Sequence, residues 1–184
     1  MPTVLVSEAD WLKLGIVRFA SGGVDALKVE QMAKDLGCSK SSFYWYFKSR
    51  DVYIERLLSH WFDIGTTNFI EMASQIEPVE VRFRSLLHAV FSQRNGKDFM
   101  FYLRQYIQQE PKYASILASI ETTRIDYLAS VLRDSGASPE DANAKAQIIY
   151  DTYVGWYERH KYTPLTEREI QEQVEILIKH LNLF

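Results

Sequence analysis

The chain has 184 residues, of which 47% are hydrophobic and 14% aromatic, and it carries a net charge of −3. This apolar content suffices for a buried core and excludes a disordered chain. The single cysteine, Cys38, excludes an internal disulfide and a cysteine-rich metal site. No run of about 18 apolar residues predicts a membrane span, and the start MPTVLVSEAD has no signal-peptide pattern. We therefore expect a cytoplasmic location.

The charge is distributed unevenly along the chain. Residues 28–50 contain five basic and two acidic side chains, a net of +3, whereas residues 61–184 contain 13 basic and 17 acidic ones, a net of −4. A small basic segment on an acidic body indicates a local contact with a polyanion. An excess of three charges is modest for a segment of this length, so chance is the competing explanation.

The apolar residues follow a helical period throughout, and no strand or hairpin pattern is present. We expect an all-α fold of about nine helices. Ser7 is the predicted cap of the first helix, and Gly22-Gly23 is predicted to end it. The next two helices are short, at about 26–36 and 39–46, and Gly37 separates them.

Ser49 is the predicted cap of a long fourth helix, and Pro78 suits the first turn of a fifth. A turn is expected at 94–97. Apolar periodicity and helix breakers predict the remaining helices, which cover about 98–109, 111–135, 139–161 and 166–182. The charge shift and the Ser49 cap together predict two domains, residues 1–50 and 51–184.

The segment SKSSFYWYFKSR at 39–50 combines five aromatic rings with basic and hydroxyl side chains. On a helical wheel, Phe43 and Phe47 share one edge and are expected to dock on the first two helices. The opposite edge carries the groups expected to face outward, which are Ser41, Tyr44, Trp45 and Lys48, flanked by Lys40 and Ser42.

An exposed face of this kind suits a nucleic acid. Hydroxyl groups donate to phosphate oxygens, lysines attract phosphates and release counterions, and a flat ring presses on a sugar or a thymine methyl. Arg50 and the free N–H groups at the start of the fourth helix can hold another phosphate. Two short helices joined by a glycine-containing turn, with the second helix exposed, form a helix-turn-helix. The alternative is a structural three-helix element whose rings are all core.

Residues of about 7–58 resemble the N-terminal domain of the TetR family of bacterial transcriptional regulators. The resemblance lies in three stretches that follow one another with the family's spacing: FASGGV at 19–24, VEQMAKDLGCSK at 29–40 and SFYWYFKSRD at 42–51. The rest of the chain is similar to the family only in its helical layout.

The resemblance implies contacts with double-stranded DNA. Tyr44 and Tyr46 would touch the backbone, Arg50 would contact a phosphate, and the major groove would receive Lys40, Ser41, Ser42 and Trp45. The chain departs from the family at two positions. Lys28 stands where a phosphate-contacting Thr or Ser is usual, so we expect Lys28 to replace that contact as a point charge, and Tyr46 stands where His is common. The expected DNA-binding residues are Lys28, Lys40, Ser41, Ser42, Tyr44, Trp45, Tyr46, Lys48 and Arg50.

The last two predicted helices carry apolar stripes with helical spacing. The stripes contain Ile149, Tyr153, Trp156, Tyr157, Ile170, Val174, Leu177, Ile178 and Leu181. Two such helices from each of two copies form a four-helix bundle, and the resemblance implies this homodimer. Its two recognition helices would lie ~34–36 Å apart on a near-palindromic operator. The alternative is that both stripes pack within one chain.

The middle helices are rich in aromatic residues, namely Trp61, Phe69, Phe99, Tyr102, Tyr106 and Tyr127. Tyrosines give a pocket an apolar wall with polar tips, although each ring taken alone is more often part of a core. The resemblance implies a small-molecule effector in this region, which would shift the spacing of the recognition helices.

No pattern for catalysis, a cofactor or a metal is found, and the four histidines are scattered (His60, His88, His160 and His180), so we expect no enzyme. The resemblance implies a dimeric, effector-responsive transcriptional regulator, a repressor, with a C-terminal helical ligand-binding and dimerisation domain. The strongest alternative is a non-enzymatic helical dimer that binds a protein partner through the aromatic face. Duplex binding that weakens steeply with salt would favour DNA.

Overall fold

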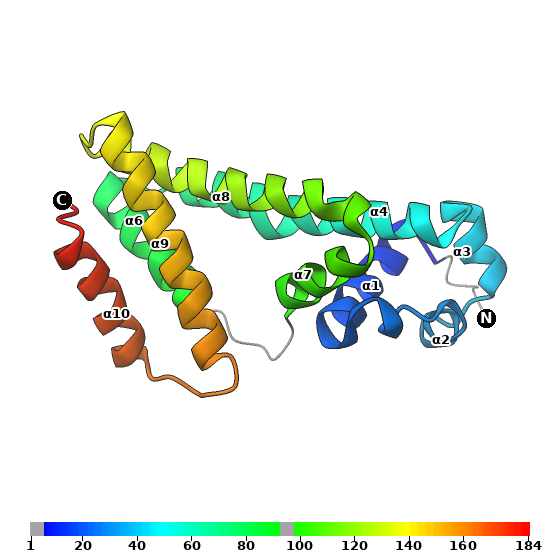
Figure 1. Cartoon of the computed structure of the whole chain (residues 1–184). Coiled ribbons are helices and arrows are strands. Elements are labelled where there is room, and N and C mark those ends of the chain that lie inside the picture. The colour runs from blue at the N-terminus through cyan, green and yellow to red at the C-terminus, as the bar shows by residue number, and fades with distance from the viewer. Residues whose placement is uncertain (1–5, 93–97) are drawn as a thin grey trace. The chain divides into compact units, whose positions relative to one another are not determined.

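The computed structural model describes residues 6–92 and 98–184. In this part of the chain every regular element is helical, which confirms the all-α class (Figure 1). The chain divides into two compact units, one of Met1–Gly65 with Lys97–Ala118 and one of Thr66–Gly96 with Ser119–Phe184. The turn expected at 94–97 lies outside the described residues. None of the helices in the described ranges has the length and hydropathy needed to cross a membrane.

Helix α1 (Glu8–Gly22) begins at the predicted cap. The Ser7 hydroxyl accepts the backbone N–H of Asp10 at 3.3 Å, and the Asp10 carboxylate accepts the backbone N–H of Ser7 at 2.8 Å. This reciprocal capping box satisfies N–H groups that have no partner inside the helix. The hydrogen bonds from Ser7 also lower the pKa of Asp10. The 3₁₀ turn η1 (Gly23–Ala26) follows directly.

Helices α2 (Val29–Asp35) and α3 (Lys40–Phe47) form the predicted helix-turn-helix. Gly37 turns the chain with a φ of 67°, a conformation that glycine adopts without the steric cost of a Cβ atom. The Cys38 N–H donates to the Ala33 carbonyl at 2.9 Å, and the Gly37 N–H donates to the Lys34 carbonyl at 3.1 Å. This pair of bonds is a Schellman motif, which satisfies carbonyls at the end of α2.

Helix α4 (Arg50–Phe62) packs closely against α1 because Gly15 has no side chain. A Cβ atom at Gly15 would lie 1.9 Å from the Tyr53 hydroxyl oxygen. That buried hydroxyl donates to the Trp11 carbonyl at 3.0 Å and so ties α4 to α1. Burial also raises the pKa of Tyr53.

The first unit is completed by α7 (Phe99–Gln109), the 3₁₀ turn η3 (Pro111–Tyr113) and the start of α8 (Ala114–Asp134). Helix α7 packs on α1, and the Asp98 N–H donates to the Ala20 carbonyl at 2.7 Å.

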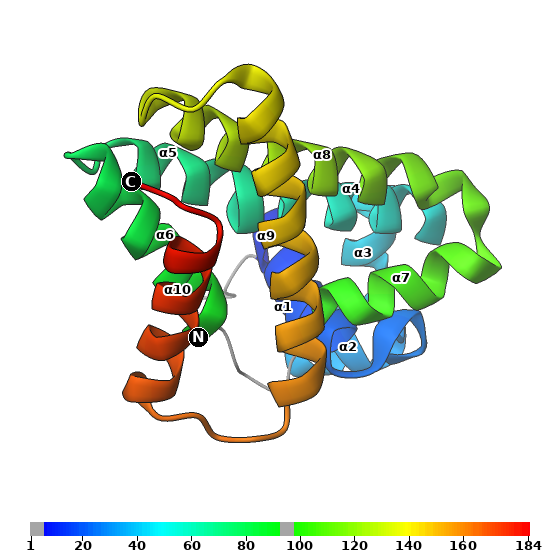
Figure 2. The ribbon, with the colours of Figure 1, turned by 60° about the vertical axis from the view of Figure 1, so that its left-hand side comes forward.

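The second unit has its own core. Helix α4 passes through a π-helical stretch (η2, Asp63–Thr67) into the short helix α5 (Asn68–Ser74). Helix α6 (Val79–Ser92) contacts α5, α9 (Pro139–His160) and α10 (Glu167–His180) (Figure 2). Apolar side chains of α6, α8, α9 and α10 fill the space between them, including Phe83, Leu87, Val131, Ala146, Ile149 and Val174.

Candidate nucleic-acid interface

Helix α3 presents two chemically different edges, as the wheel predicts. Phe43 and Phe47 are fully buried, with ring centroids 5.1 Å apart. The Phe43 ring packs 5.2 Å from Trp11 of α1 and 4.9 Å from Tyr53 of α4. The phenylalanines therefore anchor α3 to α1 and α4.

The other edge of α3 is open. Tyr44 is 52% exposed and Trp45 is 70% exposed, and Ser41 and Lys48 are exposed as well. The predicted division between anchored and outward-facing residues is thus confirmed. A phenol, an indole, a hydroxyl and an ammonium group within eight residues give this edge both hydrogen-bond donors and flat apolar surface.

Ser42 lies between the two edges and is partly buried. Its hydroxyl oxygen accepts a hydrogen bond from the indole N–H of Trp11 at 3.3 Å. The side chain therefore helps to hold α3 on α1. The sequence did not indicate this pairing, because the two residues are 31 positions apart and no local pattern connects them.

Tyr46 is also only partly exposed, and its hydroxyl donates to the Val6 carbonyl at 2.9 Å. That bond fixes the segment before α1 to α3. The resemblance implies a DNA backbone contact for this residue, whereas the structure gives its hydroxyl a partner in the same chain.

Lys48 ends α3 in an unusual backbone conformation, with a φ of 62° and a ψ of −44°. The Ser49 N–H donates to the Phe47 carbonyl at 2.6 Å across it, which makes a γ-turn. Positive φ is costly for a residue with a side chain. Ser49 then caps α4 by accepting the Val52 N–H at 3.2 Å.

Arg50 and Lys28 flank the helix-turn-helix, and both are exposed. The Arg50 guanidinium donates to the Val24 carbonyl at 2.8 Å, so it is held near the turn that precedes α2. Lys28 occupies the cap position of α2, where its side chain makes no capping hydrogen bond.

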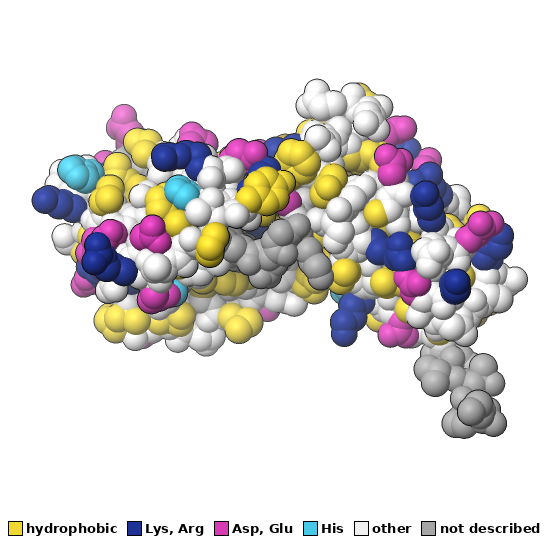
Figure 3. Space-filling view, turned by 90° about the horizontal axis from the view of Figure 1, so that it is seen from below, with side chains coloured by type: hydrophobic (Ala, Val, Ile, Leu, Met, Phe, Trp, Pro, Cys, Tyr) yellow, Lys and Arg dark blue, Asp and Glu magenta, His cyan; other side chains and the backbone are white. Residues whose placement is uncertain are grey.

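Lys40, the first residue of α3, forms an ion pair with Glu30 of α2. The Glu30 side chain is 77% exposed and that of Lys40 is 55% exposed. Their hydrogen bond raises the pKa of Lys40 and lowers the pKa of Glu30. A second pair joins Asp35 of α2 to Arg18 of α1. On the face shown in Figure 3, basic and acidic side chains are likewise interspersed rather than gathered in one patch.

The residues predicted for dimerisation lie mostly in the core of the second unit. Ile149, Ile170, Val174, Leu177 and Ile178 are buried there, and Tyr153, Trp156 and Leu181 pack against this core. Tyr157 is partly exposed. Within this chain the stripes face the core, while Tyr153, Trp156, Tyr157 and Leu181 keep part of their surface exposed. The dimer itself stays a prediction.

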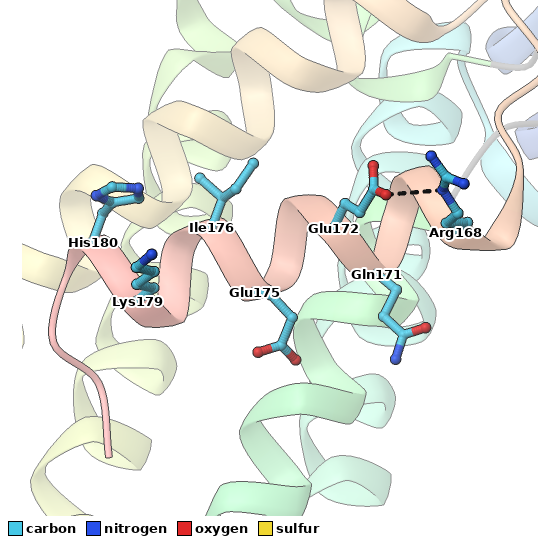
Figure 4. A pocket seen from close by; sticks show the side chains of 7 residues that line it. All are labelled: Arg168, Gln171, Glu172, Glu175, Ile176, Lys179 and His180. Atoms are coloured by element: carbon cyan, nitrogen blue, oxygen red, sulfur yellow. Dashed lines mark hydrogen bonds and ion pairs between the residues drawn. The ribbon is translucent and has the colours of Figure 1, made fainter.

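The outward faces of α9 and α10 carry other residues. Ile148 is 49% exposed and Ile176 is 50% exposed. A shallow groove follows α10 around Ile176, and charged and polar side chains dominate its lining (Figure 4), which consists of Arg168, Gln171, Glu172, Glu175, Ile176, Lys179 and His180. A second shallow groove lies between α6 and α10, with His88, Arg84 and Glu167 in its lining.

The aromatic residues predicted for an effector pocket are divided between the two units. In the first unit, Trp61 stacks on Phe99 with ring centroids 4.4 Å apart. The Phe19 ring packs against Phe99 and also against Tyr102 and Tyr106. Burial raises the pKa of Tyr106 to about 12. In the second unit, Phe69 packs on the core and the Tyr127 hydroxyl accepts the Ser74 hydroxyl at 3.2 Å. The pocket stays a prediction.

The described ranges contain no group of three or more His, Cys, Asp or Glu residues that could hold a metal ion. Two of the histidines have partners in the second unit: His88 pairs with Glu167, and His160 bonds the Trp156 carbonyl at 2.9 Å.

Residues 13–56 match a family model described as bacterial regulatory proteins of the tetR family. This match runs from within α1 to the middle of α4 and confirms the resemblance found in the sequence. A search of curated proteins finds no match.

Several solved structures share the fold. A transcriptional regulator from Rhodococcus sp. Rha1 has a TM-score of 0.73 and 17% identity, over 95% of this chain and 97% of that one. A TetR-like transcriptional regulator from Rhodococcus sp. RHA1 has a TM-score of 0.68 and 18% identity, over 98% of this chain and 97% of that one. The ketosteroid transcriptional regulator KstR2 of Mycobacterium tuberculosis has a TM-score of 0.59 and 19% identity, over 97% of this chain and 96% of that one. At these identities the likeness shows the fold, which is that of TetR-family regulators.

Proposed function

We propose that this chain is a DNA-binding transcriptional regulator, a repressor, that contacts duplex DNA through the open edge of α3. The observation that carries the proposal is the division of α3 itself. Phe43 and Phe47 are fully buried, while Tyr44 and Trp45 project from the same eight-residue helix with more than half of their surface exposed. A helix anchored in this way is rigid enough to enter a groove and presents groups that bind phosphates and base edges.

The backbone contacts in this proposal come from residues around the open edge. Tyr44, Lys48 and Arg50 supply a phenol, an ammonium and a guanidinium group to phosphates, and Lys28 adds a fourth contact at the cap position of α2. Ser41 and Trp45 face the bases. Ser42 and Tyr46 act mainly through their bonds to Trp11 and Val6, and they hold the open edge in place.

The test is a gel-shift titration against a pool of random duplexes at several salt concentrations. We expect affinity to fall steeply with salt, because each neutralised phosphate releases about one counterion. The double substitution Tyr44→Ala with Lys48→Ala should weaken binding by at least tenfold without changing the helical content. The matched control, Tyr162→Ala with Arg133→Ala, removes one tyrosine and one basic side chain from exposed positions in the other unit. Unchanged affinity in the α3 variant would refute the assignment.

The competing function is binding of a protein partner to the same edge of α3. The exposed Trp45 favours it, because tryptophan is enriched in protein interfaces. Salt dependence separates the two functions. Capture of a protein that is insensitive to salt, with no binding to any duplex, would support the competitor.

The proposal extends to the rest of the chain. Residues 1–50 act as the DNA-binding domain, and residues 51–184 carry homodimerisation and the response to a small-molecule effector that releases the operator. The support is the family fold of the whole chain together with the aromatic series around Phe99. One of the similar structures is described as a ketosteroid regulator, which makes a largely apolar effector the class to test first.

A further inference from the structure

One ion pair is located where α3 would meet the bases. Lys40 is the first residue of α3, and in helix-turn-helix proteins the first residues of the second helix contact base edges. Glu30 of α2 is hydrogen-bonded to the Lys40 ammonium group, so both groups occupy the same end of the motif. Lys40 also lies one helical turn before Tyr44 on α3, so the two side chains share a face of the helix and Lys40 lies beside the open edge.

A carboxylate in this position has a specific consequence. Near phosphates an acidic side chain is repelled, so Glu30 weakens binding to an arbitrary duplex. Such a repulsive element favours the one partner that can satisfy it, and this is how many specific interfaces discriminate. In the major groove the hydrogen-bond donors on base edges are the amino groups of cytosine and adenine, and Glu typically accepts from cytosine N4.

The ammonium group of Lys40 has the complementary preference. It donates to the O6 and N7 atoms of guanine. A G·C pair presents both partners on one edge, since guanine supplies two acceptors and cytosine supplies the donor. The Glu30–Lys40 pair, with its acceptor and donor side by side, matches that edge.

We propose that Glu30 and Lys40 together read one G·C pair in each half-site, with Lys40 on guanine and Glu30 on the cytosine amino group. This inference rests on the proposed function, because it requires α3 to lie in the major groove. It adds Glu30, an acidic residue of α2, to the residues that determine sequence specificity.

The test selects bound sequences from a random duplex pool with the full chain and with three variants. Glu30→Ala and Lys40→Ala each remove one member of the pair. Asp35→Ala is the matched control, because it removes an equal charge from the same helix, and Asp35 pairs with Arg18 of α1. Both members of the pair have more than half of their side-chain surface exposed, so these substitutions leave the core intact.

We expect the full chain to select a fixed G·C pair in each half-site. Glu30→Ala and Lys40→Ala should lose about 5- to 10-fold of the discrimination against A·T at that same pair, as measured by titration on the two matched duplexes. The remaining positions, and the sites selected by Asp35→Ala, should not change.

The outcomes separate the two proposals. If the full chain enriches no duplex, the proposed function fails. If it enriches a defined site and Glu30→Ala selects the identical site, the function stands and the inference is overturned. Loss of preference at different base pairs in the two variants, or an equal change in Asp35→Ala, also overturns the inference.

Discussion

Lys48 combines a strained backbone with an exposed charge. Its φ of 62° in a γ-turn costs energy for any residue with a Cβ atom. We expect Lys48→Gly to stabilise the chain by about 1 kcal/mol, because glycine adopts positive φ freely, and to weaken duplex binding several-fold, because the ammonium group is lost. Thermal unfolding and gel-shift titration measure the two effects.

Lys48→Ala is the control for this prediction. It removes the charge and retains the Cβ atom, so it should weaken binding equally without the gain in stability. If Lys48→Gly and Lys48→Ala unfold at the same temperature, the backbone at this position is not strained.

Gly15 sets the distance between α1 and α4. A methyl group there would displace the Tyr53 hydroxyl from its bond with Trp11. We expect Gly15→Ala to destabilise the chain by about 1–3 kcal/mol in urea unfolding. Gly155→Ala in α9 is the matched control, since no atom lies within 4 Å of its added Cβ. That substitution should stabilise the chain by roughly 0.5–1 kcal/mol through helix propensity. Equal effects of both substitutions would contradict the close packing at Gly15.

The buried Tyr53 hydroxyl makes the free energy of unfolding depend on pH in the alkaline range. Its pKa is raised in the folded chain by burial. Above pH ~10 the unfolded chain therefore loses a proton that the folded chain keeps, and stability falls as pH rises. We expect Tyr53→Phe to reduce this slope by up to ~1.4 kcal/mol per pH unit, in urea titrations between pH 9.5 and 11.5. Tyr162→Phe, at a residue that is 83% exposed, serves as the control. An unchanged slope in Tyr53→Phe would contradict the buried hydroxyl.

At the scale of the element, α3 distinguishes its two tyrosines. Tyr44 faces outward, while the Tyr46 hydroxyl is bonded to Val6. We therefore expect Tyr44→Phe to weaken duplex binding about two- to tenfold, as expected for the loss of one hydrogen bond to a charged phosphate. Tyr46→Phe should have a smaller effect. Parallel gel-shift titrations compare them, and a larger loss in Tyr46→Phe would reverse the roles of the two tyrosines.

The helices were predictable from local chemistry. Ser7 and Ser49 mark the starts of α1 and α4, and Gly37 marks the turn between α2 and α3. Helix α5 was not predicted as a separate helix, because the chain stays helical through the π-helical stretch before it, which contains no proline. Thr67, at the cap position of α5, makes no capping hydrogen bond with its side chain.

The open edge of α3 was predictable for a similar reason, since eight residues and a helical period determine which side Phe43 and Phe47 take. Hydrogen-bond partners that are distant in sequence were not predictable. The bonds from Trp11 to Ser42 and from Tyr46 to Val6 depend on how α3 lies against α1, and no spacing rule encodes this. The apolar stripes of α9 and α10 show the same limit, because periodicity indicates a buried face without indicating whether the same chain or a second copy covers it.

At the scale of the whole molecule, the predicted homodimer has to use surface that remains outside the core of the second unit. Ile176 on α10 is half exposed in the shallow groove along that helix. We expect Ile176→Asp to weaken self-association at least tenfold in sedimentation at micromolar concentration, and to weaken operator binding with it, because two linked half-sites bind more tightly than one. Ile64→Asp, which alters an isoleucine of similar exposure in the first unit, is the control. A chain that sediments as a monomer before any substitution would contradict the dimer.

The contrast between Trp11 and Trp45 has a practical consequence. Trp11 is sealed from solvent and Trp45 is largely surrounded by it, although both belong to the first unit. Indole emission shifts to shorter wavelength as water is removed, so contact between α3 and a duplex should change the light emitted by Trp45 and leave that of Trp11 constant. Trp45 therefore reports DNA contact within the combined emission of four tryptophans, and Trp45→Phe silences this reporter alone.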